Sequence, residues 1–84
     1  MRYRLELKLK RAEGALIRVL GMTERRGYPP HAIHANLDGD GRWLLALVID
    51  SNRSPETLRQ QLLKIYDVDA ISISALQELQ ERAA

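Results

Sequence analysis

The sequence predicts a single α+β domain in which two helices cover one face of a four-stranded antiparallel sheet. Apolar and charged residues alternate over residues 3–9, as in a strand with one buried and one solvated face. Over residues 15–26 the apolar spacing changes to three and four, which is typical of an amphipathic helix. The full order of elements is strand–helix–strand–strand–helix–strand. Because strand–helix–strand crossovers are right-handed as a rule, both helices lie on the same face, which makes a ferredoxin-like βαββαβ sandwich.

The first strand and the first helix each have a clear apolar face. The buried face of the strand carries Tyr3, Leu5, Leu7 and Leu9. The helix follows a short connection, and its apolar stripe carries Leu16, Val19, Leu20 and Thr23. Gly27 ends this helix at the position where a left-handed cap favours glycine. Pro29 and Pro30 then favour an extended chain, and we expect a second strand over residues 32–37.

The second half of the chain supplies two strands and a helix. Residues 38–41 (DGDG) predict a hairpin turn, because Asp-Gly provides the positive φ that such turns need. The unbroken apolar run over residues 43–49 indicates a central strand covered on both faces. Residues 54–56 (SPE) are typical of a helix start, with an N-cap, a proline in the first turn and an acid that complements the helix dipole. We expect the last strand over residues 68–74.

We place the domain at residues 1–74 and treat residues 75–84 as a C-terminal tail with a helix-favouring composition. One feature of the predicted sheet indicates a partner. Leu44, Ala46 and Val48 lie on the second face of their strand, which the two helices leave open. Because soluble proteins rarely expose a continuous apolar surface, a partner chain is the simplest cover for these residues.

Composition excludes several classes of protein. A chain of 84 residues buries a limited share of its surface, so oligomerisation is a natural source of stability. The chain has no cysteine, which excludes disulfides, thiolate metal sites and thiol catalysis. It has no apolar run long enough to span a membrane, and charges interrupt its N-terminal segment where a signal peptide would be apolar. We therefore expect a cytoplasmic protein with no membrane association.

Metal binding and catalysis are not indicated. His31 and His34 are three residues apart on a predicted strand, which places them on opposite faces, so we expect no metal site there. The acids of the 38–41 turn lack the remaining ligands of a calcium loop. We expect no catalytic residues, because no Ser-His-Asp or paired-carboxylate arrangement is suitably spaced. Asp67 and Asp69 lie at a helix–strand junction, where solvated carboxylates are common.

Nucleic-acid binding is disfavoured as well. The net charge is only +2, and the two central strands offer only Tyr3 and Trp43 as aromatic residues for base stacking. The turn before the first helix is the remaining candidate site. A helix N-terminus attracts carboxylates and other anions, and Gly14 allows a ligand or a second backbone to approach closely. Taken alone, Gly14 fits a simple tight turn equally well.

A family resemblance makes this turn more specific. Residues 14–21 (GALIRVLG) followed by residues 26–28 (RGY) resemble the signature of ACT domains, and most of all that of the acetolactate synthase small subunit. Residues 62–68 (LLKIYDV) resemble the helix-to-strand passage L-x-K-L-x-D-V of the same family. The resemblance extends over residues 3–74. It matches the short form of the small subunit, a single ACT domain of the type paired with the isozyme II catalytic subunit.

The resemblance implies a candidate effector site. In valine-sensitive relatives, the effector binds at the dimer interface against the loop before the first helix. The matching positions here are Ala12, Glu13, Gly14, Ala15 and Leu16, where the amides near Gly14 would receive the amino acid's carboxylate. We add Ile33, which together with Leu16 could line an apolar pocket. Arg11 stands where the family often has Asn, and arginine can only donate hydrogen bonds. We therefore expect activation without feedback by valine.

The resemblance also implies the partners. It predicts a homodimeric regulatory subunit that binds and activates the acetolactate synthase large catalytic subunit in branched-chain amino-acid (valine, isoleucine, leucine) biosynthesis. Thiamine diphosphate, magnesium and FAD would be held by that large subunit, and we expect no cofactor in this chain. The alternative is a free-standing ACT-domain sensor that binds an amino acid without a catalytic partner.

Overall fold

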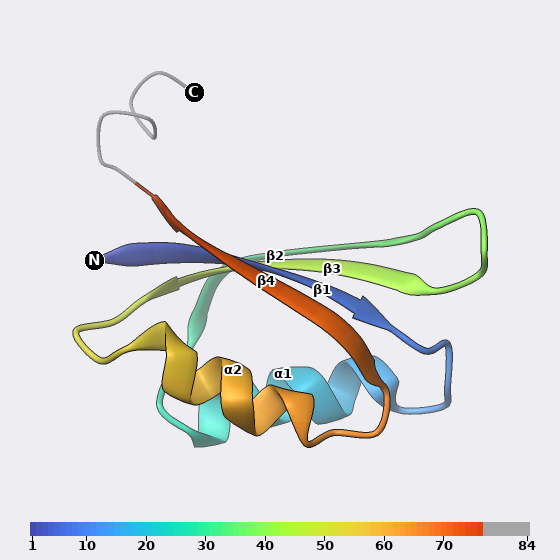
Figure 1. Ribbon diagram of the computed structural model, residues 1–84, viewed down its shortest axis with the longest axis horizontal. Helices are drawn as coiled ribbons and strands as arrows, with labels where there is room; N and C mark the ends of the chain where they lie inside the picture. Colours follow the sequence, from blue (N-terminus) through green and yellow to red (C-terminus); the bar gives the residue numbers. More distant parts are fainter. Residues whose placement is uncertain (77–84) are drawn as a thin grey trace.

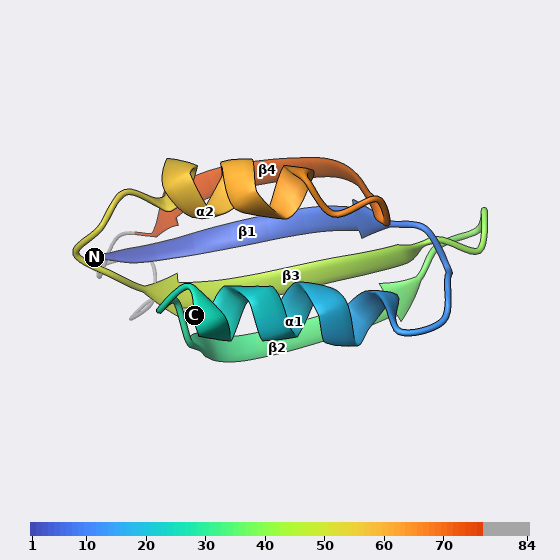
Figure 2. The same ribbon diagram turned by 90° about the horizontal axis from the view of Figure 1, so that it is seen from below.

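The computed structural model describes residues 1–76 and shows the predicted α+β architecture. The elements are β1 (Arg2–Leu9), α1 (Ala15–Arg25), β2 (Pro30–Leu37), β3 (Trp43–Asp50), α2 (Pro55–Leu63) and β4 (Val68–Leu76). The strands form one antiparallel sheet in the order β2-β3-β1-β4, with both helices on one face (Figure 1). The ferredoxin-like fold is therefore confirmed, including the central position of β3. Seen from the helix side, α1 lies along the β2–β3 half of the sheet and α2 along the β1–β4 half (Figure 2).

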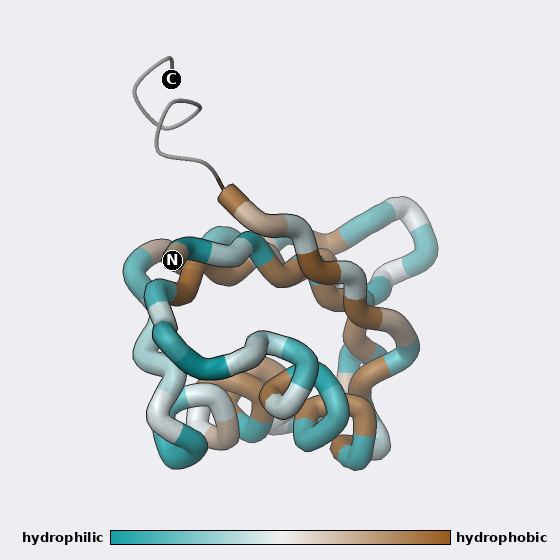
Figure 3. Tube along the Cα trace, turned by 60° about the vertical axis from the view of Figure 1, so that its left-hand side comes forward, coloured by the Kyte–Doolittle hydropathy of each residue, from teal (hydrophilic) through white to brown (hydrophobic). Residues whose placement is uncertain are grey.

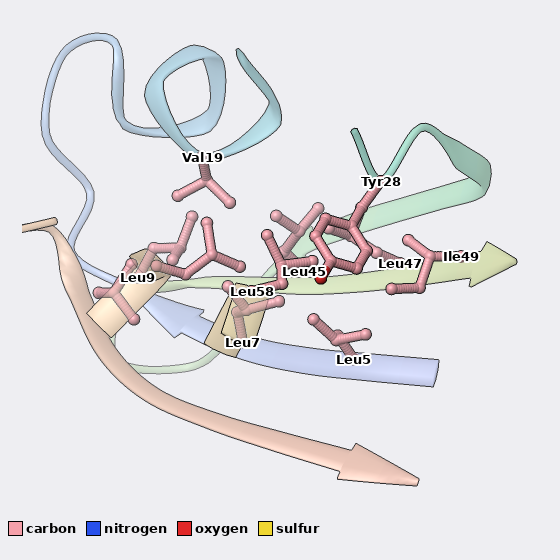
Figure 4. Packing of buried hydrophobic residues seen from close by; sticks show 11 residues of the cluster. Leu5, Leu7, Leu9, Val19, Tyr28, Leu45, Leu47, Ile49 and Leu58 are labelled. Atoms are coloured by element: carbon pink, nitrogen blue, oxygen red, sulfur yellow. The ribbon is translucent and has the colours of Figure 1, made fainter. Parts of the chain in front are cut away.

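The core lies between the sheet and the two helices. Cross-strand register aligns Leu5 with Leu47 and Leu7 with Leu45, and all four are buried. Figure 4 shows these side chains meeting Val19 from α1 and Leu58 from α2. Burial of each such side chain stabilises the fold by about 1.5–3 kcal/mol. Apolar residues therefore recur at every second position of β1 and at helical spacing in α1 because the sheet and the helices face the same core.

The predicted hairpin turn over residues 38–41 is present and connects β2 to β3. The positive φ of 78° belongs to Gly41 and not to Gly39. Asp38 Oδ1 accepts hydrogen bonds from the amides of Asp40 (2.8 Å) and Arg42 (2.9 Å). A side chain that caps its own loop in this way stabilises a longer connection than an Asp-Gly hairpin turn requires. The loop is hydrophilic (Figure 3).

The end of β4 lies two residues beyond the predicted boundary at residue 74. Ala75 pairs with Tyr3, and Leu76 pairs with Arg2. These two residues, predicted as the start of the tail, therefore belong to the sheet. The rest of the predicted tail, residues 77–84, lies outside the described residues.

Among the described residues, no helix covers the second face of the sheet. Here β1 carries long charged side chains, including the ion pairs Arg4–Glu6 (3.3 Å) and Lys8–Asp38 (3.6 Å). Next to them Leu44 is 43% exposed, so the described residues do not cover it. β3 is thus central in the sheet but is buried on only one face. Within residues 1–76, no helix is long and apolar enough to cross a bilayer.

Candidate functional site

The β1–α1 loop (residues 10–14) ends in a glycine that turns the chain into α1. Gly14 occupies the N-cap position with φ 77° and ψ 5°, and no side chain caps the helix. The loop is closed by backbone hydrogen bonds from Ala12 N to Lys10 O (2.9 Å) and from Ala15 N to Ala12 O (3.1 Å). The first amides of a helix lack intrahelical acceptors and carry the positive end of the helix dipole. This end of α1 therefore presents uncapped donors.

A hollow of about 410 Å³ lies at this end of the helix. Its lining residues are Arg11, Ala12, Glu13, Gly14, Ala15, Leu16, Ile17 and Trp43. Five of the six residues proposed from the sequence therefore lie together around one hollow. The lining carries one arginine, one glutamate and apolar side chains, and it contains no histidine, serine or cysteine. It thus offers one cationic and one anionic side chain beside apolar groups.

Ile33 is not among the lining residues. It pairs with Leu47 in the middle of β2, whereas the strand reaches the loop end of the sheet at Leu37, which pairs with Trp43. At about 3.3 Å per residue, Ile33 lies roughly 13 Å along the strand from that rung. Trp43 instead supplies the aromatic wall. The signal that could have identified Trp43 is its register, because it pairs with Leu9, the last residue of β1 before the loop.

Arg18 holds the loop in shape from one turn inside α1. Its Nη2 donates to the carbonyl oxygen of Glu13 (2.8 Å), and its Nε donates to Oδ2 of Asp67 (2.6 Å). A Cβ at Gly14 would lie 3.0 Å from Arg18 Nη1, in addition to the strain of a positive φ. The glycine and the arginine of the GALIRVLG sequence are thus needed for the same local geometry.

A second charged group lies beside the loop. Lys10 Nζ donates to Asp69 Oδ1 (2.6 Å), and the guanidinium of Arg42 also hydrogen-bonds the Asp69 carboxylate. The hydrogen bond from Lys10 lowers the pKa of Asp69 below its usual value, and the charge of Arg42 acts in the same direction. The pKa of Asp38 is also lowered, chiefly by the hydrogen bond from the Arg42 amide. Both carboxylates therefore remain ionised at neutral pH and compensate neighbouring cations.

The other end of α1 is closed by side chains. Gly27 (φ 85°) follows the C-cap residue Arg26. Tyr28 is buried at 2% exposure, and its hydroxyl donates to the carbonyl oxygen of Ser54 (3.0 Å). The guanidinium of Arg53 lies 4.5 Å from the centroid of the Tyr28 ring and donates to the Arg26 carbonyl. At this end of α1, the Arg26 carbonyl has a hydrogen-bond donor and the Tyr28 ring is covered.

No metal-binding cluster is present within residues 1–76, because no three histidine, aspartate or glutamate side chains come together in a way that could hold a metal ion. The Asp38 carboxylate, which the sequence placed in a turn, caps that turn. The hollow at the start of α1 is therefore the candidate functional site.

Comparison with known proteins supports the fold and gives a family. A family model described as ACT domain matches residues 11–71. The search of curated protein sequences gave no match. Among solved structures, the ACT domain from GTP pyrophosphokinase of Chlorobium tepidum is similar, with TM-score 0.75 and 18% identity, over 93% of this chain and 90% of that chain.

Two further structures share the fold. Formyltetrahydrofolate deformylase from Burkholderia mallei has TM-score 0.74 and 18% identity, over 89% of this chain and 28% of that chain. The C-terminal domain of the MgtC protein from Mycobacterium tuberculosis has TM-score 0.70 and 17% identity, over 92% and 88% respectively. At these identities the likeness concerns the fold alone, whereas the family model matches most of the chain.

Proposed function

The chain belongs to the ACT domain family, a family of regulatory amino-acid-binding domains that are not catalytic, and on this premise we propose that it is the small regulatory subunit of an acetolactate synthase. It would bind and activate the thiamine-diphosphate-dependent large subunit in branched-chain amino-acid biosynthesis. The large subunit would hold thiamine diphosphate, magnesium and FAD. This chain would contribute contacts that favour the active arrangement of its partner, since a regulator acts only through differential affinity for two states.

The observation that carries the proposal is the place of the signature residues in the structure. Gly14 and Arg18 shape the open start of α1, and Gly27 and Tyr28 close its end. All four stand in the segments GALIRVLG and RGY, which resemble the small subunit of acetolactate synthase. A sequence that only needed an amphipathic helix would not require glycine at both positive-φ positions.

The hollow at the start of α1 is the proposed effector site. The amides near Gly14, which no side chain caps, would receive a carboxylate together with Arg11, since the guanidinium and the helix dipole favour an anion there. Leu16 and Trp43 would pack against the apolar side chain of a branched-chain amino acid. The proposed site comprises Ala12, Glu13, Gly14, Ala15 and Leu16 and does not include Ile33. Arg11 can donate to the carboxylate but, unlike Asn, offers no acceptor for the ammonium group, and we propose on this ground that activation occurs without feedback by valine.

A homodimer is part of the same proposal, and β2 is the element that supports it. β2 lies at the edge of the sheet, and its side chains Ile33 and Leu37 are 54% and 43% exposed. Ile17 on α1 is 77% exposed and lines the hollow. An edge strand with exposed apolar residues is a template for pairing with another chain. Pairing of two β2 strands would cover Ile33 and Leu37 and would set the two hollows near the interface.

The experiment that tests the proposal is reconstitution. The purified large subunit is assayed for acetolactate formation with increasing amounts of this protein. We expect the rate to rise and then saturate. The ACT domain of the Chlorobium tepidum GTP pyrophosphokinase serves as a control that shares the fold and should have no effect. An unchanged rate with the cognate large subunit would exclude the proposed function.

A free-standing amino-acid sensor is the second candidate, favoured by the hollow itself. It would use the same loop but would need no catalytic partner. Calorimetric titration of the protein with valine, leucine and isoleucine separates the two candidates. Saturable binding together with no effect on any large subunit would favour the sensor.

A further inference from the structure

Asp67 is one of two polar side chains buried among the described residues, and the only charged one. The other is Thr23, whose hydroxyl donates to Val19 O within its own helix (2.9 Å). Asp67 lies in the turn between α2 and β4 and is 4% exposed. A buried carboxylate is costly unless it is paired. Its partner is Arg18, 49 residues earlier in the sequence, and this burial corrects the expectation of a solvated acid.

Three further contacts join this turn (residues 64–67, the α2–β4 turn) to the β1–α1 loop. The amide of Lys10 donates to the carbonyl oxygen of Asp67 (2.7 Å). Lys10 Nζ donates to the carbonyl oxygen of Tyr66 (3.1 Å) and lies 4.6 Å from the centroid of the Tyr66 ring. Through Nη2, Arg18 also holds Glu13 O. The loop that borders the hollow and the turn that carries Tyr66 are thus linked by backbone and by side chains.

The two groups that Arg18 bonds differ in burial, since Asp67 is buried and Glu13 lies in an exposed loop. The Asp67 carboxylate cannot remain buried without Arg18, because loss of one partner leaves an uncompensated charge. Glu13 and Gly14 belong to an exposed loop that a ligand can displace. One guanidinium serves both, with Nε on Asp67 and Nη2 on Glu13. A displacement of the Glu13 carbonyl therefore has to be accommodated by movement of Arg18 and, with it, of Asp67.

We propose that Arg18 and Asp67 are positioning residues that couple the β1–α1 loop to the α2–β4 turn. A change of loop shape then alters the turn that presents Tyr66, whose side chain is 82% exposed. Binding of a ligand in the hollow and binding of a partner at Tyr66 consequently affect each other, and this coupling is reciprocal in binding free energy. This inference goes beyond the regulatory-subunit proposal and requires neither an effector nor a large subunit.

The test compares backbone amide NMR spectra of the full chain, of three single variants and of the Asp67→Asn/Arg18→Lys double variant, all without any ligand. Asp67→Asn keeps the shape of the side chain but weakens its bond to Arg18. Arg18→Lys keeps the charge but cannot hold Asp67 and Glu13 together, because lysine lacks the forked guanidinium. Asp50→Asn is the matched control, since it is the same acid-to-amide change and Asp50 pairs with the N-terminal amine and with Arg2, outside the loop and the turn.

We expect Asp67→Asn to shift the amide signals of Glu13 and Gly14 and the emission of Trp43, the single tryptophan of the chain. Arg18→Lys should shift the signals of Tyr66 and Val68 and speed hydrogen exchange at the Lys10 amide about tenfold. In the double variant, the shifts at Glu13 should be no larger than those of Arg18→Lys alone. A purely stabilising role would lower the melting temperature without this non-additivity.

Three results would overturn the coupling. The amide signals of Glu13 and Gly14 could be unmoved in Asp67→Asn, or Asp50→Asn could shift them equally, or the two single effects could simply add. If Asp67→Asn fails to fold, Arg18→Lys decides alone, because its side chain is 49% exposed and its charge is kept. Unmoved signals at Tyr66 and Val68 in that variant contradict the coupling. All these readouts are independent of the reconstitution assay, so failure of one proposal is distinguishable from failure of the other.

Discussion

The two ends of helix α1 are built from the same residue types, a glycine and an arginine, but one end is closed and the other is open. Each has a glycine with positive φ, and at each an arginine side chain lies close to the place that a Cβ would take, Arg18 at Gly14 and Arg53 at Gly27. At the C-terminal end, Arg53 stacks on the buried Tyr28 ring and bonds a helix carbonyl, which closes that end. At the N-terminal end, Arg18 donates to a loop carbonyl and to Asp67, no side chain caps the first helix amides, and a hollow lies beside them.

This difference between the two ends of α1 indicates that the closed end serves stability and the open end serves binding. The closed end satisfies its polar groups internally and contributes an aromatic ring to the core. The open end has no side-chain cap, so water, a ligand or a partner can satisfy its first amides. We expect variants of the closed end to change stability first and variants of the open end to change binding first.

The largest effect is expected at Tyr28. Tyr28→Ala removes a buried ring and should lower the free energy of unfolding by about 3–5 kcal/mol. Tyr28→Phe keeps the ring and removes only the hydrogen bond to Ser54, so about 1 kcal/mol is expected. Urea denaturation followed by circular dichroism measures both. Equal losses in the two variants would mean that the hydroxyl, and not the ring, closes this end.

Exchange of each glycine for alanine has a smaller effect and separates the two ends. A residue other than glycine in the left-handed region costs about 1–2 kcal/mol, so Gly27→Ala and Gly14→Ala should both be destabilised by that amount. Only Gly14→Ala should alter the emission of Trp43, which shares the hollow with Gly14.

Gly21→Ala is the matched control for this pair. Gly21 lies inside α1, has no positive φ, and has no atom within 4 Å of the place of a Cβ. Alanine should therefore stabilise the protein by up to about 1 kcal/mol. If Gly27→Ala changed the Trp43 emission as much as Gly14→Ala, the two ends would not be independent.

The smallest effect is expected from acid. The folded-state pKa of Asp69 is lowered, chiefly by the hydrogen bond from Lys10, so the unfolded chain binds more protons than the folded one between the two pKa values. The resulting stabilisation is present above the ordinary carboxyl pKa of 3.8 and is lost as the pH falls through the folded-state pKa. Melting temperatures of wild type and Asp69→Asn from pH 2 to pH 6 measure it. We expect a shallower acid slope in the variant, and parallel curves would refute this assignment.

The fold was predictable because its signals are local. Alternation in β1, the S-P-E start of α2 and Gly27 at the end of α1 each act within a few residues, and Ser54 Oγ does accept the Glu56 amide (3.2 Å). The loop residues of the site were predictable from the family resemblance and line one hollow in the structure.

The remaining features depend on contacts between distant parts of the chain. Trp43 reaches the hollow through strand register, and Asp67 is buried through a partner 49 residues away. Ile33 was misplaced in the hollow for the same reason, since only register fixes its position along β2. No periodicity or local motif carries this information.

The most direct test of the account is activation of the acetolactate synthase large subunit by the two glycine variants, each at a temperature where it is folded. The account predicts that Gly27→Ala activates like the wild type, whereas Gly14→Ala loses much of the activation because the open end of α1 is altered. Equal activation by both variants would contradict the claim that this end of the helix carries the regulatory function.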